Sequence, residues 1–175
     1  MHALIVGANG TGKTTLIRRV LQALQKPVAG FETKKEDTLT DVNGSPIYIY
    51  EAGKPHRQTP ENLVGYCRER KAMPVQNGFD RFAGKLLEPV KADCVIEMDE
   101  IGFLESRSQP FCETILSLMD GRRPILAAVR DKDTAFLRAV RAHPNARCFY
   151  LTPENREDLF REVLDFMRAQ LEEST

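Results

Sequence analysis

The 175-residue sequence lacks the features that mark several classes of protein. Its 25 basic and 25 acidic residues leave no net charge that would favour nucleic acid or an anionic membrane as a partner. No apolar run approaches the roughly 20 residues needed to cross a bilayer, and the N-terminus has neither the charged segment nor the cleavage site of a secretory signal. We therefore expect a cytoplasmic protein that binds neither nucleic acid nor membrane.

The few cysteines and histidines form no metal-binding or disulfide pattern. The four cysteines are widely spaced without a C-x-x-C pair, and no histidine cluster completes a zinc site. We interpret the cysteines as buried thiols of a reducing compartment and assign the histidines no catalytic role. The residues concerned are Cys67, Cys94, Cys112, Cys148, His2, His56 and His143.

The most informative stretch is a glycine-rich segment near the N-terminus. It follows an apolar run of strand length at residues 3–6 and precedes a helical pattern at residues 16–21. Strand, glycine-rich loop and helix are the context in which the motif G-x-x-x-x-G-K-[ST] binds the phosphates of a nucleotide. We predict nucleotide binding for Gly7, Ala8, Asn9, Gly10, Thr11, Gly12, Lys13, Thr14 and Thr15.

Each residue type in this phosphate loop has a physical role. Glycines let successive backbone N–H groups face a phosphate chain, and the following helix adds its partly positive N-terminus. Lys13 is predicted to be catalytic, with its charge at the β- and γ-phosphates. The Thr14 hydroxyl is predicted to bind Mg²⁺, which prefers oxygen ligands. The loop therefore predicts a site for a nucleoside triphosphate and Mg²⁺.

Two adjacent carboxylates follow a second apolar strand, which we expect at residues 93–98. Asp99 is the predicted Mg²⁺ ligand at the end of this strand, beside the phosphate loop, and it acts through a water molecule. Glu100 is the predicted catalytic residue that orients a water toward the γ-phosphate, because the backbone turns where a strand ends. Two surface carboxylates would give the same pattern, and Glu97 competes for the metal role.

The pattern along the rest of the chain predicts a three-layer α/β fold in one domain, residues 1–175, with a mixed, mainly parallel sheet. Asn43-Gly44 is typical of a tight turn between residues 38–42 and 47–50, which predicts an antiparallel hairpin at about 30–51. Residues 52–78 are predicted to be an irregular connection. Helices are expected at 79–87, from Pro110 to Gly121, after an Asp133 cap and after a Thr152 cap, with strands at 124–129 and 147–151.

Five polar residues outside these motifs are weaker candidates. Arg68 and Arg70 either lie on a solvated face or belong to a loop that closes on the γ-phosphate. Arg130 ends a core strand, where it can contact phosphate. Asn155 and Arg156 follow another core strand, where ligands meet open α/β sheets, and we predict that they contact the nucleotide base.

Four segments of the chain resemble the small P-loop nucleoside-triphosphatase family, which includes the human cancer-related NTPase and thermostable archaeal and bacterial NTPases. The segments are GANGTGKTT from Gly7, GFET from Gly30, DEIGFLE from Asp99 and LTPENR from Leu151. They occur in the family's order and at about its spacing, and the resemblance covers roughly residues 3–166.

This resemblance implies a RecA-like mixed sheet and slow, Mg²⁺-dependent hydrolysis of several nucleoside triphosphates, ATP and GTP among them, to diphosphate and phosphate. It also implies the roles given above for Lys13, Thr14, Asp99 and Glu100. The chain departs from the family at residues 66–82 and at Arg130-Asp131-Lys132. The identity of a charge-stabilising arginine and the preferred base therefore stay open.

Two other functions fit the same motifs. A small-molecule or nucleoside kinase would use Arg68 and Arg70 in a lid that excludes water, although a carboxylate beside the metal site favours attack by water. A nucleotide-gated adaptor would dock a protein partner on the ribbon at 30–51 and use hydrolysis to reset its state. A nucleoside triphosphate is the ligand in all three cases.

Overall fold

We describe the fold from a computed structural model that covers residues 1–86, 88 and 93–173. The strands are β1 (His2–Gly7), β2 (Val28–Lys35), β3 (Ser45–Glu51), β4 (Leu63–Arg68), β5 (Lys71–Pro74), β6 (Val95–Ile101), β7 (Ile125–Arg130) and β8 (Ala146–Tyr150). The α-helices are α1 (Lys13–Leu24), α2 (Gly78–Leu86), α3 (Gln109–Asp120), α4 (Ala135–Arg141) and α5 (Arg156–Glu173).

All of these strands belong to one sheet, in the order β5-β4-β3-β2-β6-β7-β1-β8. Each neighbouring pair from β2 to β8 is parallel. Beyond β2, the strands β3, β4 and β5 extend the sheet by antiparallel pairing. The expected α/β fold with a mixed, mainly parallel sheet is thereby confirmed.

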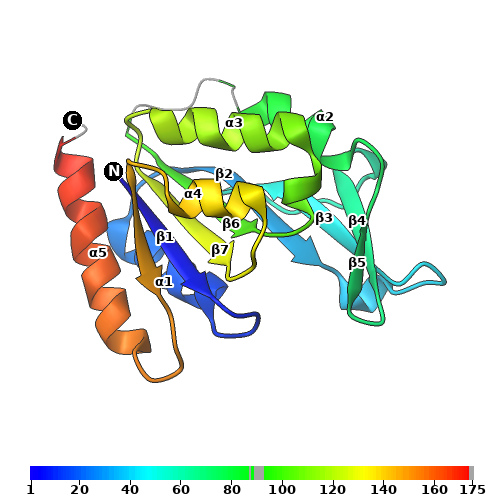
Figure 1. Cartoon of the computed structure of the whole chain (residues 1–175), viewed down its shortest axis with the longest axis horizontal. Helices are drawn as coiled ribbons and strands as arrows, with labels where there is room; N and C mark the ends of the chain where they lie inside the picture. Colours follow the sequence, from blue (N-terminus) through cyan, green and yellow to red (C-terminus); the bar gives the residue numbers. More distant parts are fainter. Residues whose placement is uncertain (87, 89–92, 174–175) are drawn as a thin grey trace.

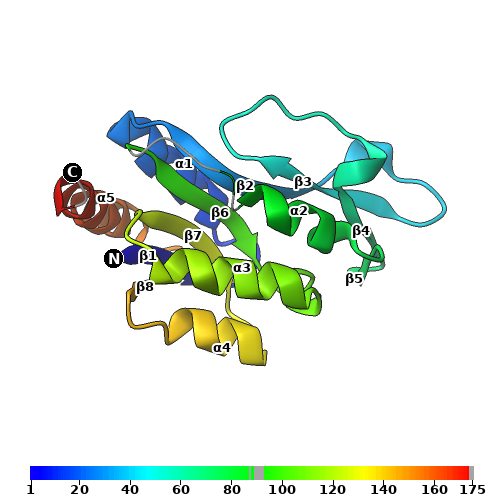
Figure 2. The ribbon, with the colours of Figure 1, turned by 90° about the horizontal axis from the view of Figure 1, so that it is seen from above.

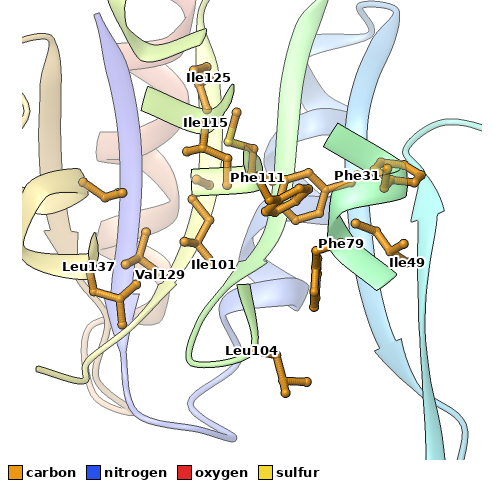
Figure 3. Close-up of a cluster of buried hydrophobic side chains, with 14 of the residues drawn as sticks. Phe31, Ile49, Phe79, Ile101, Leu104, Phe111, Ile115, Ile125, Val129 and Leu137 are labelled. Carbon is orange, nitrogen blue, oxygen red and sulfur yellow. The ribbon is translucent and has the colours of Figure 1, made fainter. Parts of the chain in front are cut away.

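Helices cover both faces of the sheet and give the expected three layers. Figures 1 and 2 show α2, α3 and α4 on one face and α1 and α5 on the other. On the first face, the fully buried ring of Phe111 in α3 has its centroid 5.1 Å from that of Phe31 and 5.0 Å from that of Phe79 (Figure 3). A second core joins β1 to α1 and α5. The residues of β1 are all buried, as expected for a strand covered on both faces.

The predicted hairpin exists, but its first strand was wrongly placed. It is β2 that pairs with β3, with Lys35 opposite Ile47. Within the stretch predicted as that strand, Asp37–Leu39 forms a short 3-10 helix and Asp41 forms a turn with Gly44. Local bonds explain the difference, because the Thr40 hydroxyl donates to the carbonyl of Asp37, at 2.7 Å, in competition with strand pairing.

The prediction of an irregular connection at 52–78 was wrong for much of its length. Residues 63–68 and 71–74 form β4 and β5, which make a second hairpin at the edge of the sheet. Their pairing partners lie in β3 and in each other, and strand formation depends more on such neighbours than on local preference. Pro74 ends edge strand β5, a position where proline is tolerated, whereas Gly65 lies inside β4.

The helices were predicted in the right places, with differences at their ends. The helix expected at 79–87 is α2, and Leu87 lies outside the described residues. The helix expected from Pro110 to Gly121 is α3, with Pro110 in its first turn. The cap of α4 was wrong: Thr134, not Asp133, accepts a hydrogen bond from the backbone N–H of Leu137, at 3.1 Å. Among the described residues, none of the helices is long and apolar enough to cross a membrane.

The cysteines are free thiols of differing exposure. Cys94 is buried, whereas the other three are only partly buried. The expectation of buried thiols was therefore right for Cys94 alone.

Candidate active site

The loops that carry the predicted site residues meet at one edge of the sheet. The phosphate loop follows β1, and the loops after β7 and β8 lie at the same edge, at the bottom in Figure 1, because parallel strands end together. Strand β6 carries Asp99 and Glu100, and β7 lies between β6 and β1. Arg130, the last residue of β7, therefore reaches this edge of the sheet beside Glu100, with which it pairs.

The phosphate loop folds around the side chain of Lys13. Gly10 and Gly12 have φ values of 78° and 100°, in the left-handed region that glycine adopts without strain. Lys13 begins α1 and is only 4% exposed. Its ammonium group donates hydrogen bonds to the carbonyl oxygens of Gly7 and Ala8, both at 2.9 Å. The loop thus holds a buried cation at the N-terminus of a helix.

Thr14 and Asp99 come together from distant parts of the chain. The Thr14 hydroxyl donates a hydrogen bond to Oδ1 of Asp99 at 3.1 Å. Burial raises the pKa of Asp99 to about 6, and the charges of Glu100 and Glu32 also raise it, whereas the bond from Thr14 lowers it. The structure therefore pairs a hydroxyl oxygen with a carboxylate that has been taken out of water.

These two oxygen donors fit Mg²⁺. Hydroxyl and carboxylate oxygens are the ligands this ion takes, and its charge would offset the cost of burying the Asp99 carboxylate. Within residues 1–86, 88 and 93–173 there is no group of three or more His, Cys, Asp and Glu side chains suited to hold a metal alone. An ion held by Thr14 and Asp99 would therefore need further oxygens from phosphates and water, as is usual for Mg²⁺.

Glu100 lies between two cations. Its Oε2 atom is 3.2 Å from Nζ of Lys13, and its Oε1 atom pairs with Nε of Arg130. The Glu100 side chain is 20% exposed, so water reaches it. The side chain thus faces the phosphate loop, where the predicted role requires it.

Two other carboxylates on or after β6 are buried. Glu97, the competing metal candidate, is 4% exposed inside the strand, and burial raises its pKa to about 8, with the charges of Glu32 and Asp99 adding to the effect. Glu105 had no predicted role, yet its Oε2 atom accepts a hydrogen bond from the N–H of Gly102 at 2.9 Å. Burial raises the pKa of Glu105 to about 7. Its place in the DEIGFLE segment was the signal that could have drawn attention to it.

The Asn155 side chain stabilises the loop between β8 and α5 through two hydrogen bonds. Its side-chain oxygen accepts from the N–H of Thr152 at 2.9 Å, and its amide nitrogen donates to the carbonyl of Tyr150 at 2.8 Å. The predicted Thr152 cap was therefore wrong, because α5 begins only at Arg156. Arg156 lies against the phosphate loop, since a Cβ atom placed on Gly12 would be 3.8 Å from its Nε atom.

A cavity of about 700 Å³ adjoins the carboxylates on the side away from β8. Asn9 of the phosphate loop, Glu100 and Arg130 line one end of it. The antiparallel strands supply further lining residues, among them Cys67 and Arg70. The site thus combines a phosphate loop, paired oxygen donors, a water-accessible carboxylate and space beside it.

The sequence is similar to a known family and to curated proteins over nearly its whole length. The family model described as NTPase matches residues 2–164. Nucleoside-triphosphatase THEP1 of Pyrococcus abyssi is 30% identical, over 98% of this chain and 94% of its own length. The cancer-related nucleoside-triphosphatase homolog of Mus musculus is 27% identical, over 96% of this chain and 97% of its own length.

Two solved structures share the fold. The crystal structure of THEP1 from Aquifex aeolicus has a TM-score of 0.70 at 24% identity and covers 95% of this chain and 99% of its own. The solution structure of a human cancer-related nucleoside triphosphatase has a TM-score of 0.69 at 22% identity and covers 96% of this chain and 97% of its own.

Proposed function

Because the chain belongs to the NTPase family, we propose that it hydrolyses nucleoside 5′-triphosphates, ATP and GTP among them, to diphosphate and phosphate in a Mg²⁺-dependent reaction. The names of its relatives support the reaction class. The observation that carries the proposal is the position of Glu100, a water-accessible carboxylate held 3.2 Å from the phosphate-loop lysine.

Substrate binding would use the phosphate loop. The backbone N–H groups of residues 7–15 and the N-terminus of α1 are positive dipoles suited to a triphosphate. Lys13 now donates to the loop's own carbonyl oxygens at 2.9 Å and would exchange these bonds for bonds to β- and γ-phosphate oxygens. Arg156 lies beside Gly12 and can reach the same ligand.

Thr14 and Asp99 would hold the metal ion, Asp99 through a water molecule. When bound there, Mg²⁺ would supply positive charge that offsets the negative charge of the triphosphate during the reaction. The two residues also fix each other, because the hydroxyl donates to the carboxylate at 3.1 Å.

Glu100 would orient the attacking water and accept its proton. The contacts with Lys13 and Arg130 fix the orientation of the Glu100 carboxylate, while part of the side chain stays in contact with solvent. P-loop sites turn over at on the order of 10⁻⁴ s⁻¹ without an arginine at the γ-phosphate and about 10⁻² s⁻¹ with one supplied within the chain, so slow hydrolysis is expected in either case. We also propose broad base specificity, which is supported by the engagement of the Asn155 amide within its own loop rather than with a base.

The test is phosphate release from ATP, GTP, CTP and UTP with Mg²⁺. We expect slow release from several of them by the wild type, and none by Lys13→Ala or Glu100→Gln. Glu172→Gln, on an exposed residue of α5, is the matched control and should keep the wild-type rate. Tight nucleotide binding without phosphate release by the wild type would contradict the proposal.

The size of the cavity beside Glu100 favours one competing function, transfer of the γ-phosphoryl group to an organic acceptor. A volume of about 700 Å³ is in the range of small-molecule sites and far exceeds the space of one water molecule. Product analysis separates the two functions: label from the γ-phosphate appears in inorganic phosphate for a hydrolase and in an organic phosphate for a kinase.

A further inference from the structure

The turn between β4 and β5 contributes to the lining of the cavity beside Glu100. Strand β4 is antiparallel to β3, which is antiparallel to β2, so β4 ends at the same edge of the sheet as β2 and β6. The β4–β5 turn therefore lies on the side of the phosphate loop, as Figure 1 shows. Glu69 and Arg70 form this turn and line the cavity together with Asn9, Glu100 and Arg130.

The turn has an unusual sequence for its conformation. Glu69 and Arg70 have φ values of 50° and 64°, and a two-residue hairpin turn with positive φ at both positions is normally Asn-Gly or Asp-Gly. Residues held in such sparsely populated conformations gather at functional sites. The two long, charged side chains are thus kept at a position where the backbone alone would favour small residues.

Arg70 differs from the other cations around the cavity. Arg130 is paired with Glu100, and Nζ of Lys35 lies 2.9 Å from Oδ1 of Asp37. In the part of the chain that the structure describes, Arg70 makes no hydrogen bond or ion pair. It is therefore the arginine of this cavity whose charge is left for a ligand.

The structure also separates Arg70 from its neighbour Arg68, which the sequence could not do. Arg68 donates to the carbonyl of Val42 at 3.4 Å and is not part of the cavity lining. The two residues carry the same guanidinium group and are both exposed, so they form a matched pair for experiment.

We propose that Arg70 is the charge-stabilising arginine of the reaction, supplied within the chain by the β4–β5 turn to the γ-phosphoryl group. The inference rests on the proposed hydrolysis. Negative charge on the γ-phosphoryl oxygens would draw the Arg70 guanidinium across the cavity, and the hairpin, at the free edge of the sheet, can move with it. Arg130 stays with Glu100 and keeps that carboxylate directed at the water.

The experiment compares Arg70→Ala, Arg70→Lys and Arg68→Ala with the wild type in single-turnover hydrolysis of ATP and in binding of ADP. An arginine at the γ-phosphate is worth on the order of 10³-fold in rate, so Arg70→Ala should lose about that factor while ADP affinity stays within about twofold. The rate of Arg70→Lys should lie between those of Arg70→Ala and the wild type, because lysine keeps the positive charge but lacks the planar guanidinium group. Arg68→Ala should match the wild type.

Two further readouts make the result specific. Binding of MgADP with aluminium fluoride, a mimic of the transferring phosphoryl group, should weaken in Arg70→Ala far more than binding of MgADP. Added guanidinium ion should restore part of the lost rate in Arg70→Ala and leave Arg68→Ala unchanged.

The outcomes are distinct. Equal rates for Arg70→Ala and Arg68→Ala would overturn the inference, and so would a joint loss of rate and ADP binding that guanidinium does not restore. In either case, loss of hydrolysis in Glu100→Gln alone would leave the proposed function standing. If the wild type itself releases no phosphate, it is the proposed function that fails.

Discussion

Replacing Glu105 by glutamine should change how the stability of the protein depends on pH. Burial raises the pKa of Glu105 to about 7 from its ordinary value of 4.5, so the folded protein holds this proton more tightly than the unfolded chain. The resulting stabilisation is fully present below pH 4.5 and is lost as the pH rises through 7. A difference between pKa values of 4.5 and about 7 corresponds to about 3 kcal/mol in the free energy of unfolding at most.

Glutamine is neutral throughout this range, and its amide oxygen can still accept the hydrogen bond from Gly102. We therefore expect the stability of Glu105→Gln, relative to the wild type, to improve by about 1–3 kcal/mol between pH 5 and pH 8. Urea unfolding of both proteins at four pH values in this interval measures the difference in their free energies of unfolding. The raised pKa values of Glu97 and Asp99 are common to both proteins and cancel in the difference.

Glu113→Gln, on an exposed residue of α3, is the control and should show no such trend. The reasoning would be refuted if the stability of Glu105→Gln, relative to the wild type, decreased between pH 5 and pH 8. That result would mean that the ionised carboxylate stabilises the fold through Gly102 and Arg130.

Three further predictions concern the metal site, the core and the sheet. Thr14→Ala should raise the Mg²⁺ concentration for half-maximal phosphate release about 10-fold or more, and EDTA should abolish release; an unchanged Mg²⁺ requirement would argue against Thr14 as a ligand. Phe111→Ala should cost about 3–5 kcal/mol in urea unfolding, because this fully buried ring packs against two others; a loss below about 1 kcal/mol would contradict that packing. Gly30→Ala should fail to fold or melt far below the wild type by circular dichroism, since its Cβ atom would lie 2.0 Å from the carbonyl oxygen of Glu97 at a φ of +109°; a wild-type melting temperature would show that β2 and β6 separate easily.

The parts of the fold that local chemistry decides were predictable from the sequence. The loop that leads into α1 was predictable because it depends on local residues. It needs glycine at positions 10 and 12 and the lysine that follows, and it needs no distant partner. The same holds for Pro110 at the start of α3. The strands β1 and β7 were found because strands covered on both faces are almost wholly apolar, and β6 was found from the apolar residues at its start.

The parts that depend on distant contacts were not predictable in the same way. Strands β4 and β5 are stabilised by pairing with β3 and with each other, so their own residues looked irregular. The order of the sheet, with β7 between β1 and β6, is a property of the whole chain. The sequence could not separate Arg70 from Arg68, nor show that Glu105 is buried, because both facts depend on the cavity that these residues share with Glu100.

The most direct test of the central claim is phosphate release measured beside nucleotide affinity for Glu100→Gln. If Glu100 directs the water, this variant should bind MgATP as tightly as the wild type and release phosphate at least about 10²-fold more slowly. A variant that releases phosphate at the wild-type rate would contradict the account, because the carboxylate 3.2 Å from Lys13 would then have no part in the reaction.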